Sequence, residues 1–73
     1  MAKNPAPGME IKYRHKGHDM RAQVVEVKSM GAGGTTADIA CYNASGHIEF
    51  GVPDAKMAKD APDRLVDGNW WIE

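Results

Sequence analysis

Apolar and polar residues alternate along several short stretches of the chain, and this period of two residues is typical of half-buried β-strands. The pattern is clear where Glu49 and Gly51 separate Ile48, Phe50 and Val52, which are predicted to face inward. The predicted strands are residues 9–14, 20–28, 36–42, 47–52 and 69–73. The third and fourth flank a turn cluster at 43–46, so they are predicted to form a hairpin.

The second predicted strand contains a cluster of valines, which favours β-structure because branched side chains fit a pleated sheet. Val24 and Val25 would point to opposite faces of a flat strand. This strand is therefore predicted either to be partly buried on both faces or to contain a β-bulge.

Glycine and proline divide these segments. Residues 15–19 are predicted to form a turn and the Gly-rich residues 29–35 a flexible loop. Pro53 lacks an N–H for the ladder and is predicted to end the fourth strand. In the connection 54–68, Asp54 is a candidate cap for a short helix reaching residue 59, and a second helical turn is placed at 63–66. The sequence leaves open whether this connection is helical.

The last segment contains Trp70, Trp71 and Ile72. Alternation places Trp70 and Ile72 toward the interior and leaves Trp71 at least partly exposed. Five short strands without a long amphipathic helix predict a mainly β fold, a small five-stranded SH3-like barrel with a helical turn before the last strand. Residues 1–7 are predicted to be a disordered tail and residues 8–73 the single domain.

A chain of 73 residues provides one small core, so self-association is a plausible route to stability. Cys41 is the single cysteine, which favours a reducing compartment. Neither a signal peptide nor an apolar membrane span is evident, and we expect a cytoplasmic protein without membrane partners.

Charge is distributed unevenly although the net charge is only −1. Residues 1–28 hold six basic and three acidic side chains, whereas residues 29–73 hold three basic and seven acidic ones. This asymmetry predicts a bipolar surface that attracts an anionic partner or pairs with a second copy.

Five short segments stand out along the chain, namely residues 8–14, residues 21–27, residues 46–50, the Val52-Pro53 step and the Gly68-Asn69-Trp70-Trp71 run. Together they resemble short uncharacterised proteins of bacteriophages and prophages. The resemblance covers residues 8–73. It implies an SH3-like barrel and a phage or mobile-element origin, with the host cytoplasm as location, and it implies no mechanism.

The spacing of Gly8, Ile11 and Arg14 is also similar to the start of plasmid-type dihydrofolate reductases, which are SH3-like barrels of comparable length. The Val-Gln-Ile-Tyr pore motif of those enzymes has no match in this chain. An enzyme formed by oligomerisation is therefore the third hypothesis, and we predict that the chain is not an enzyme.

Three motifs with chemical potential are interpreted as structural. His15 and His18 lack a complete ligand set for zinc, and the Gly-rich loop lacks a following Lys-Ser/Thr and helix for phosphate. Cys41 lies on the apolar face of its strand, where cysteine behaves as a small hydrophobe. The sequence therefore predicts no catalytic residue, no metal site and no cofactor.

The first hairpin carries a local basic patch, and nucleic-acid binding requires such charge together with aromatic rings. Tyr13 or Tyr42 is a candidate stacking platform. The candidate nucleic-acid contacts are Lys12, Arg14, Lys16 and Arg21.

Trp71 and Met57 form the candidate protein interface, because tryptophan is enriched among residues that dominate binding energy. The leading hypothesis is a non-enzymatic protein-interaction or assembly module with an unidentified protein partner or a second copy. The alternative is a weak nucleic-acid-binding protein that uses the basic first hairpin.

Overall fold

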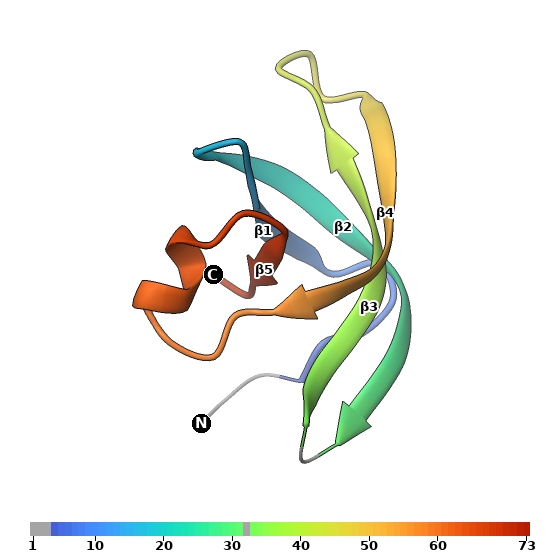
Figure 1. Cartoon of the computed structure of the whole chain (residues 1–73). Helices are drawn as coiled ribbons and strands as arrows, with labels where there is room; N and C mark the ends of the chain where they lie inside the picture. The colour runs from blue at the N-terminus through green and yellow to red at the C-terminus, as the bar shows by residue number, and fades with distance from the viewer. Residues whose placement is uncertain (1–3, 32) are drawn as a thin grey trace.

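The computed structural model describes residues 4–31 and 33–73, which form a closed five-stranded β-barrel with one short helical turn (Figure 1). The elements are β1 (Glu10–His15), β2 (His18–Gly31), β3 (Gly34–Tyr42), β4 (Ile48–Met57), the 3-10 turn η1 (Pro62–Leu65) and β5 (Asn69–Trp71). Short β5 closes the barrel by pairing antiparallel with β1 and parallel with β4. The predicted fold class, including the helical turn before the last strand, is confirmed.

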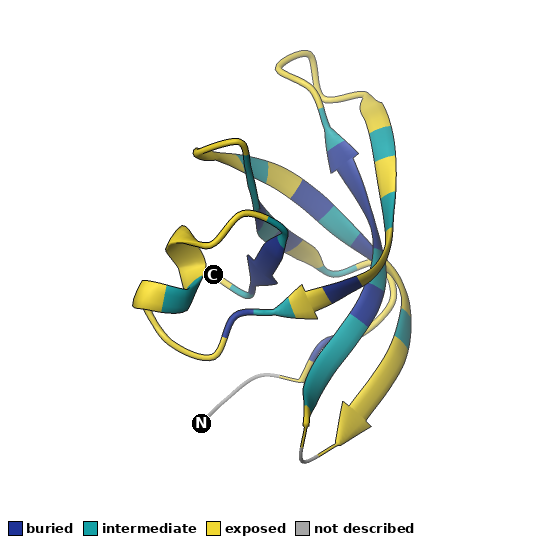
Figure 2. Cartoon of the chain, in the orientation of Figure 1, coloured by how far each residue is buried: buried dark blue, intermediate teal, exposed yellow. Residues whose placement is uncertain are grey.

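The core follows the alternation of the sequence over parts of β1 to β3, where buried residues alternate with more exposed ones (Figure 2). The prediction that Ile48 faces inward is wrong, because Ile48 is 63% exposed, while Phe50 and Val52 are partly buried against the core. Trp70 is the largest fully buried side chain, and its Nε1–H donates a hydrogen bond of 2.7 Å to the carbonyl of Ala55. This bond satisfies the one polar atom of the indole, so the ring fills the interior of the barrel without an unpaired donor.

Of the two alternatives predicted for the second strand, burial on both faces or a bulge, the structure shows the bulge. Val24 pairs with Ile39 and Glu26 with Asp38, so Val25 is an extra residue on β2. Val24 is buried, whereas Val25 is 55% exposed. The bulge therefore turns only one of the adjacent valines into the core.

The hairpin of β2 and β3 extends further than predicted. Met30 pairs with Thr35 and Gly31 with Gly34, so most of the predicted loop 29–35 belongs to the ladder, while Ala32 lies outside the described residues. Gly34 has a φ of 112°, a value that non-glycine residues rarely adopt. Glycine at position 34 therefore allows β3 to begin directly opposite the end of β2.

The prediction that Pro53 ends the fourth strand is wrong, because β4 continues to Met57. Ile39 pairs with Val52 and Ala37 with Ala55, so both Pro53 and Asp54 lie opposite Asp38 in a second bulge. Pro53 is tolerated here because a bulge interrupts the ladder. The helix proposed from Asp54 to residue 59 is also wrong, and the helical turn is confined to η1.

The N-terminal segment that was predicted to be disordered is described from residue 4 onward, whereas residues 1–3 lie outside the described part. Pro5 is buried, and the N–H of Gly8 donates a hydrogen bond of 2.7 Å to the carbonyl of Val24. Residues 4–8 thus pack against the barrel. None of the helices found in the described ranges is long and apolar enough to cross a membrane.

Candidate functional site

The four predicted nucleic-acid contacts lie on and beside the first hairpin. Lys12 of β1 stands opposite Arg21 of β2, so these two cations are cross-strand neighbours. Lys16 is exposed in the connecting turn, where it and Gly17 have φ values of 49° and 80°. Two successive positive φ angles are typical of tight hairpin turns that match the twist of the strands.

Two of the four basic side chains are paired with carboxylates. Arg14 Nη1 lies 2.8 Å from Asp19 Oδ1, and Arg21 Nη2 lies 2.7 Å from Glu10 Oε1. The hydrogen bond and the charge of Arg21 lower the pKa of Glu10, which stays ionised at neutral pH. The hairpin therefore presents two ion pairs and two separate lysines in place of a continuous positive surface.

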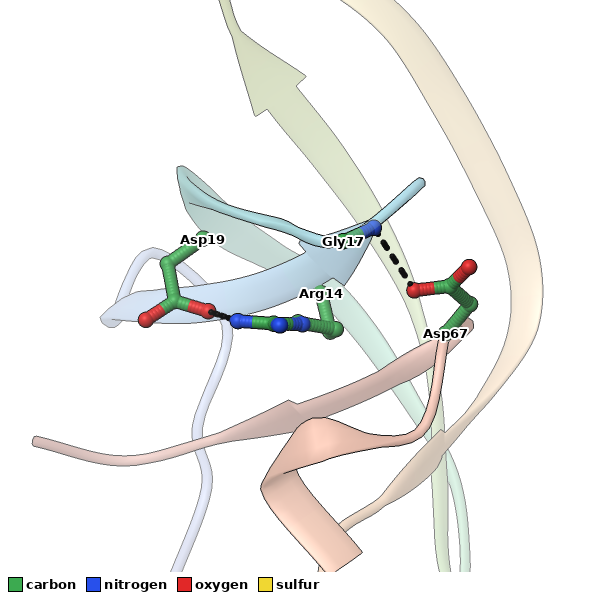
Figure 3. Close-up of polar contacts among 4 residues, drawn as sticks. All are labelled: Arg14, Gly17, Asp19 and Asp67. Carbon is green, nitrogen blue, oxygen red and sulfur yellow. Dashed lines mark hydrogen bonds and ion pairs between the residues drawn. The ribbon is translucent and has the colours of Figure 1, made fainter.

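The turn of this hairpin is tied to the segment that precedes β5 (Figure 3). The N–H of Gly17 donates a hydrogen bond of 3.0 Å to Asp67 Oδ1, and the N–H of Gly68 donates one of 2.8 Å to the carbonyl of Arg14. These contacts place another carboxylate beside the predicted nucleic-acid site. Its negative charge weakens the attraction of this surface for phosphate.

The predicted exposure of Trp71 is wrong, because this residue is only 6% exposed. Trp71 does follow inward-facing Trp70 on the opposite face of β5, but the chain folds back over it. Arg64 of η1 lies with its Cζ 5.8 Å from the ring centroid of Trp71. Met57 is half-buried against the core. Trp71 and Met57 therefore do not form an exposed patch in this conformation.

A groove of about 460 Å³ lies where β2, the end of β3, the β3–β4 turn and the start of β4 meet. Its lining residues are Asp19, Met20, Arg21, Tyr42, Asn43, Ala44 and Glu49. This groove is the candidate functional site, and we call it the Tyr42 groove. It contains one predicted contact residue, Arg21, and one predicted stacking residue, Tyr42.

Hydrogen bonds fix the shape of the Tyr42 groove. The hydroxyl of Tyr42 donates to Gln23 Oε1 on β2, so the ring is held across the two strands. Asn43 Oδ1 accepts hydrogen bonds of 2.9 and 3.1 Å from the N–H groups of Ser45 and His47. This side-chain capping of the turn orders the wall of the groove.

Glu49 was not singled out by the sequence, where it reads as an ordinary charge on an alternating strand. Cys41 pairs with Phe50 and Tyr42 with Ile48, so a register shift leaves Glu49 without a direct partner on β3. Glu49 lines the groove beside Tyr42 and has no ion pair within residues 4–31 and 33–73. The composition of a hairpin alone does not reveal such a register shift.

Cys41 lies beneath this region in the core. Burial, and secondarily the negative charge of Glu49, raise the pKa of its thiol to about 11. The thiol is therefore protonated at neutral pH, which is the unreactive form. No group of three or more His, Cys, Asp or Glu residues in the described part of the chain is arranged to hold a metal ion.

Comparisons with family models, with curated proteins and with solved structures found no match to this chain. The groove and its charges are therefore the basis for any functional assignment.

Proposed function

We propose that this protein is a non-enzymatic protein-interaction module that binds a short peptide segment of a partner in the Tyr42 groove. The observation that carries the proposal is an aromatic ring, fixed by Gln23, in the wall of a groove of about 460 Å³. Grooves of several hundred Å³ that combine apolar surface with a few polar groups are typical ligand sites.

The apolar surface of this site supports a peptide ligand. Tyr42 supplies a large ring that loses little conformational entropy on binding, because its hydroxyl is already anchored. Met20 and Ala44 line the same groove. Ile48 pairs with Tyr42 and is 63% exposed, so it extends the apolar surface at the rim. A peptide side chain packed against these residues would be removed from water, which is the main source of its affinity.

The charges favour a peptide over a nucleic acid. A phosphate ligand gains affinity from cations that are free to bind it. In the groove, Arg21 is already paired with Glu10 and Asp19 with Arg14, while the negative charge of Glu49 repels phosphate. Nucleic-acid binding through the hairpin is thus an outcome that the test must separate from peptide binding.

The test is selection of random short peptides on the immobilised protein, followed by amide NMR mapping of the selected peptides. We expect the largest shifts at residues 42–44 and 49. Tyr42→Ala should weaken binding about tenfold or more, as removal of an aromatic anchor does at other interfaces. Tyr42→Phe, which keeps the ring, should weaken it less.

Leu65→Ala is the matched control, since Leu65 is 67% exposed on η1 and does not line the groove. It should leave peptide affinity unchanged. The proposal is wrong if the selected peptides shift residues outside the groove and bind equally to Tyr42→Ala. Dispersed amide spectra of each variant establish that the barrel remains folded.

A further inference from the structure

We propose that the peptide bound in the Tyr42 groove carries a Lys or Arg side chain, which lies between the carboxylate of Glu49 and the ring of Tyr42. This inference rests on the proposed function and specifies the chemistry of the partner. It follows from the charges that line the groove and from which of them are already paired.

Three charged residues line the groove, namely Asp19, Arg21 and Glu49. Arg21 is paired at 2.7 Å with Glu10, which is not a lining residue, and Asp19 is paired at 2.8 Å with Arg14. Within each of these two pairs, the positive and the negative charge compensate each other. Glu49 remains as the carboxylate with no ion pair in the described ranges 4–31 and 33–73.

Glu49 is exposed in the groove wall, so its charge is accessible to a ligand and is screened by dissolved salt. The negative charge of Glu49 already contributes to the raised pKa of Cys41, although burial is the larger cause. A cationic ligand group would complement this charge, whereas a carboxylate or phosphate would be repelled by it.

Tyr42 adds a second reason for a cation. Its hydroxyl is engaged with Gln23, so the ring is the part of this side chain that remains for a ligand. Ammonium and guanidinium groups are attracted to the face of an aromatic ring, and the attraction increases as water is removed. The stem of a Lys or Arg side chain also packs well on apolar surface such as Met20.

The test repeats the selection of random short peptides on three proteins, wild type, Glu49→Lys and Glu73→Lys. Glu73 is exposed and outside the groove, so Glu73→Lys is matched to Glu49→Lys in net charge. We expect wild type and Glu73→Lys to select peptides with a basic residue at one position. Glu49→Lys should select acidic or neutral residues there.

Binding measurements on the selected peptides should show a clear dependence on Glu49. Glu49→Lys should weaken binding about tenfold or more, whereas Glu73→Lys should change it by less than about twofold. Replacing the basic residue of the peptide with Gln should cause a comparable loss on wild type. Raising NaCl from about 50 to about 500 mM should weaken wild-type binding by screening.

Two outcomes would overturn the inference in distinguishable ways. If the selected peptides depend on Tyr42 but lack a basic residue and bind equally to Glu49→Lys, the cationic partner is excluded and the proposed function stands. If no selected peptide depends on Tyr42, both fall. Oligonucleotides that bind in the groove and are lost on Arg21→Glu but not on Glu49→Lys would also overturn both.

Discussion

The carboxylate of Asp38 on β3 accepts a hydrogen bond of 2.9 Å from the backbone N–H of Asp54 on β4, across the bulge that contains Pro53. Asp38 also lies 3.5 Å from Lys28 Nζ. Because a side chain here replaces a missing ladder partner, we expect Asp38→Ala to lower the free energy of unfolding by about 1–2 kcal/mol. Urea denaturation measures this change.

Glu26→Ala is the control for that substitution, since it removes the other carboxylate near Lys28, at 3.1 Å, and leaves the bulge intact. An exposed ion pair of this kind contributes little to stability, because solvent screens it. Equal losses in the two variants would show that the bond from Asp54 to Asp38 contributes little.

The backbone of Asp54 gives a second prediction, because its φ is 50°. Asp and Asn tolerate this left-handed region better than other residues that carry a Cβ atom, and β-branched residues tolerate it poorly. We expect Asp54→Gly to leave stability unchanged or slightly higher, whereas Asp54→Val should cost about 1–2 kcal/mol. Paired thermal unfolding curves check this, and indistinguishable curves would contradict it.

Because Trp71 is buried, we expect its substitution to lower stability, whereas the sequence predicted that it would weaken binding to a partner. Trp71→Ala removes a ring that is 6% exposed, which costs about 3–5 kcal/mol, the whole stability of a typical domain of this size. We therefore expect Trp71→Ala to be largely unfolded in circular dichroism. Arg64→Ala, which removes only the cation over that ring, should cost about 1 kcal/mol. A folded Trp71→Ala with normal dispersion would contradict this prediction.

The sequence predicted those features of the fold that depend on local periodicity. Ile11 and Tyr13 of β1 and Ile39 of β3 are in the core, on the face that alternation assigns to them. The adjacent valines Val24 and Val25 led to two alternatives, burial on both faces or a bulge, and only the structure places the bulge at Val25.

Features that depend on contacts between distant segments were not predicted. Pro53 remains inside β4 because the side chain of Asp38, on the neighbouring strand, satisfies the next N–H. Trp71 is covered because η1 returns over β5. A register shift between β3 and β4 leaves Glu49 without a cross-strand partner at the Tyr42 groove. The sequence does not reveal this shift, so it indicated Arg21 as a contact residue but not Glu49.

The thiol of Cys41 predicts a loss of stability at alkaline pH. Its pKa is raised to about 11 in the folded chain, above the ordinary value of 9.0. In the unfolded chain the thiol ionises first, so the stabilisation is complete below about pH 9 and declines as pH rises toward 11. We expect the free energy of unfolding to fall over this range, as measured by urea denaturation at successive pH values.

Cys41→Ala is the matched variant for this pH dependence, because it removes the titrating group from a fully buried position. It should be less stable at neutral pH and should show a smaller alkaline decline. Tyr13, whose pKa is also raised, chiefly by burial, supplies a remaining decline at higher pH. An unchanged pH profile in Cys41→Ala would rule out Cys41 as the cause.

Ion pairing on the first hairpin predicts weak nucleic-acid binding that can be strengthened deliberately. Only Lys12 and Lys16 of the four candidate contacts lack an ion pair within residues 4–31 and 33–73. Two phosphate contacts with single-stranded DNA or RNA give a slope of log affinity against log salt of about −1.4. The double substitution Glu10→Gln and Asp19→Asn releases Arg21 and Arg14, so affinity should rise and the slope should approach about −2.8. Titrations followed by amide NMR measure both quantities.

A wild-type slope already near the steeper value, with shifts at Arg14 and Arg21, would contradict this prediction. It would mean that these arginines exchange their carboxylates for phosphate, and the hairpin would then be the functional surface.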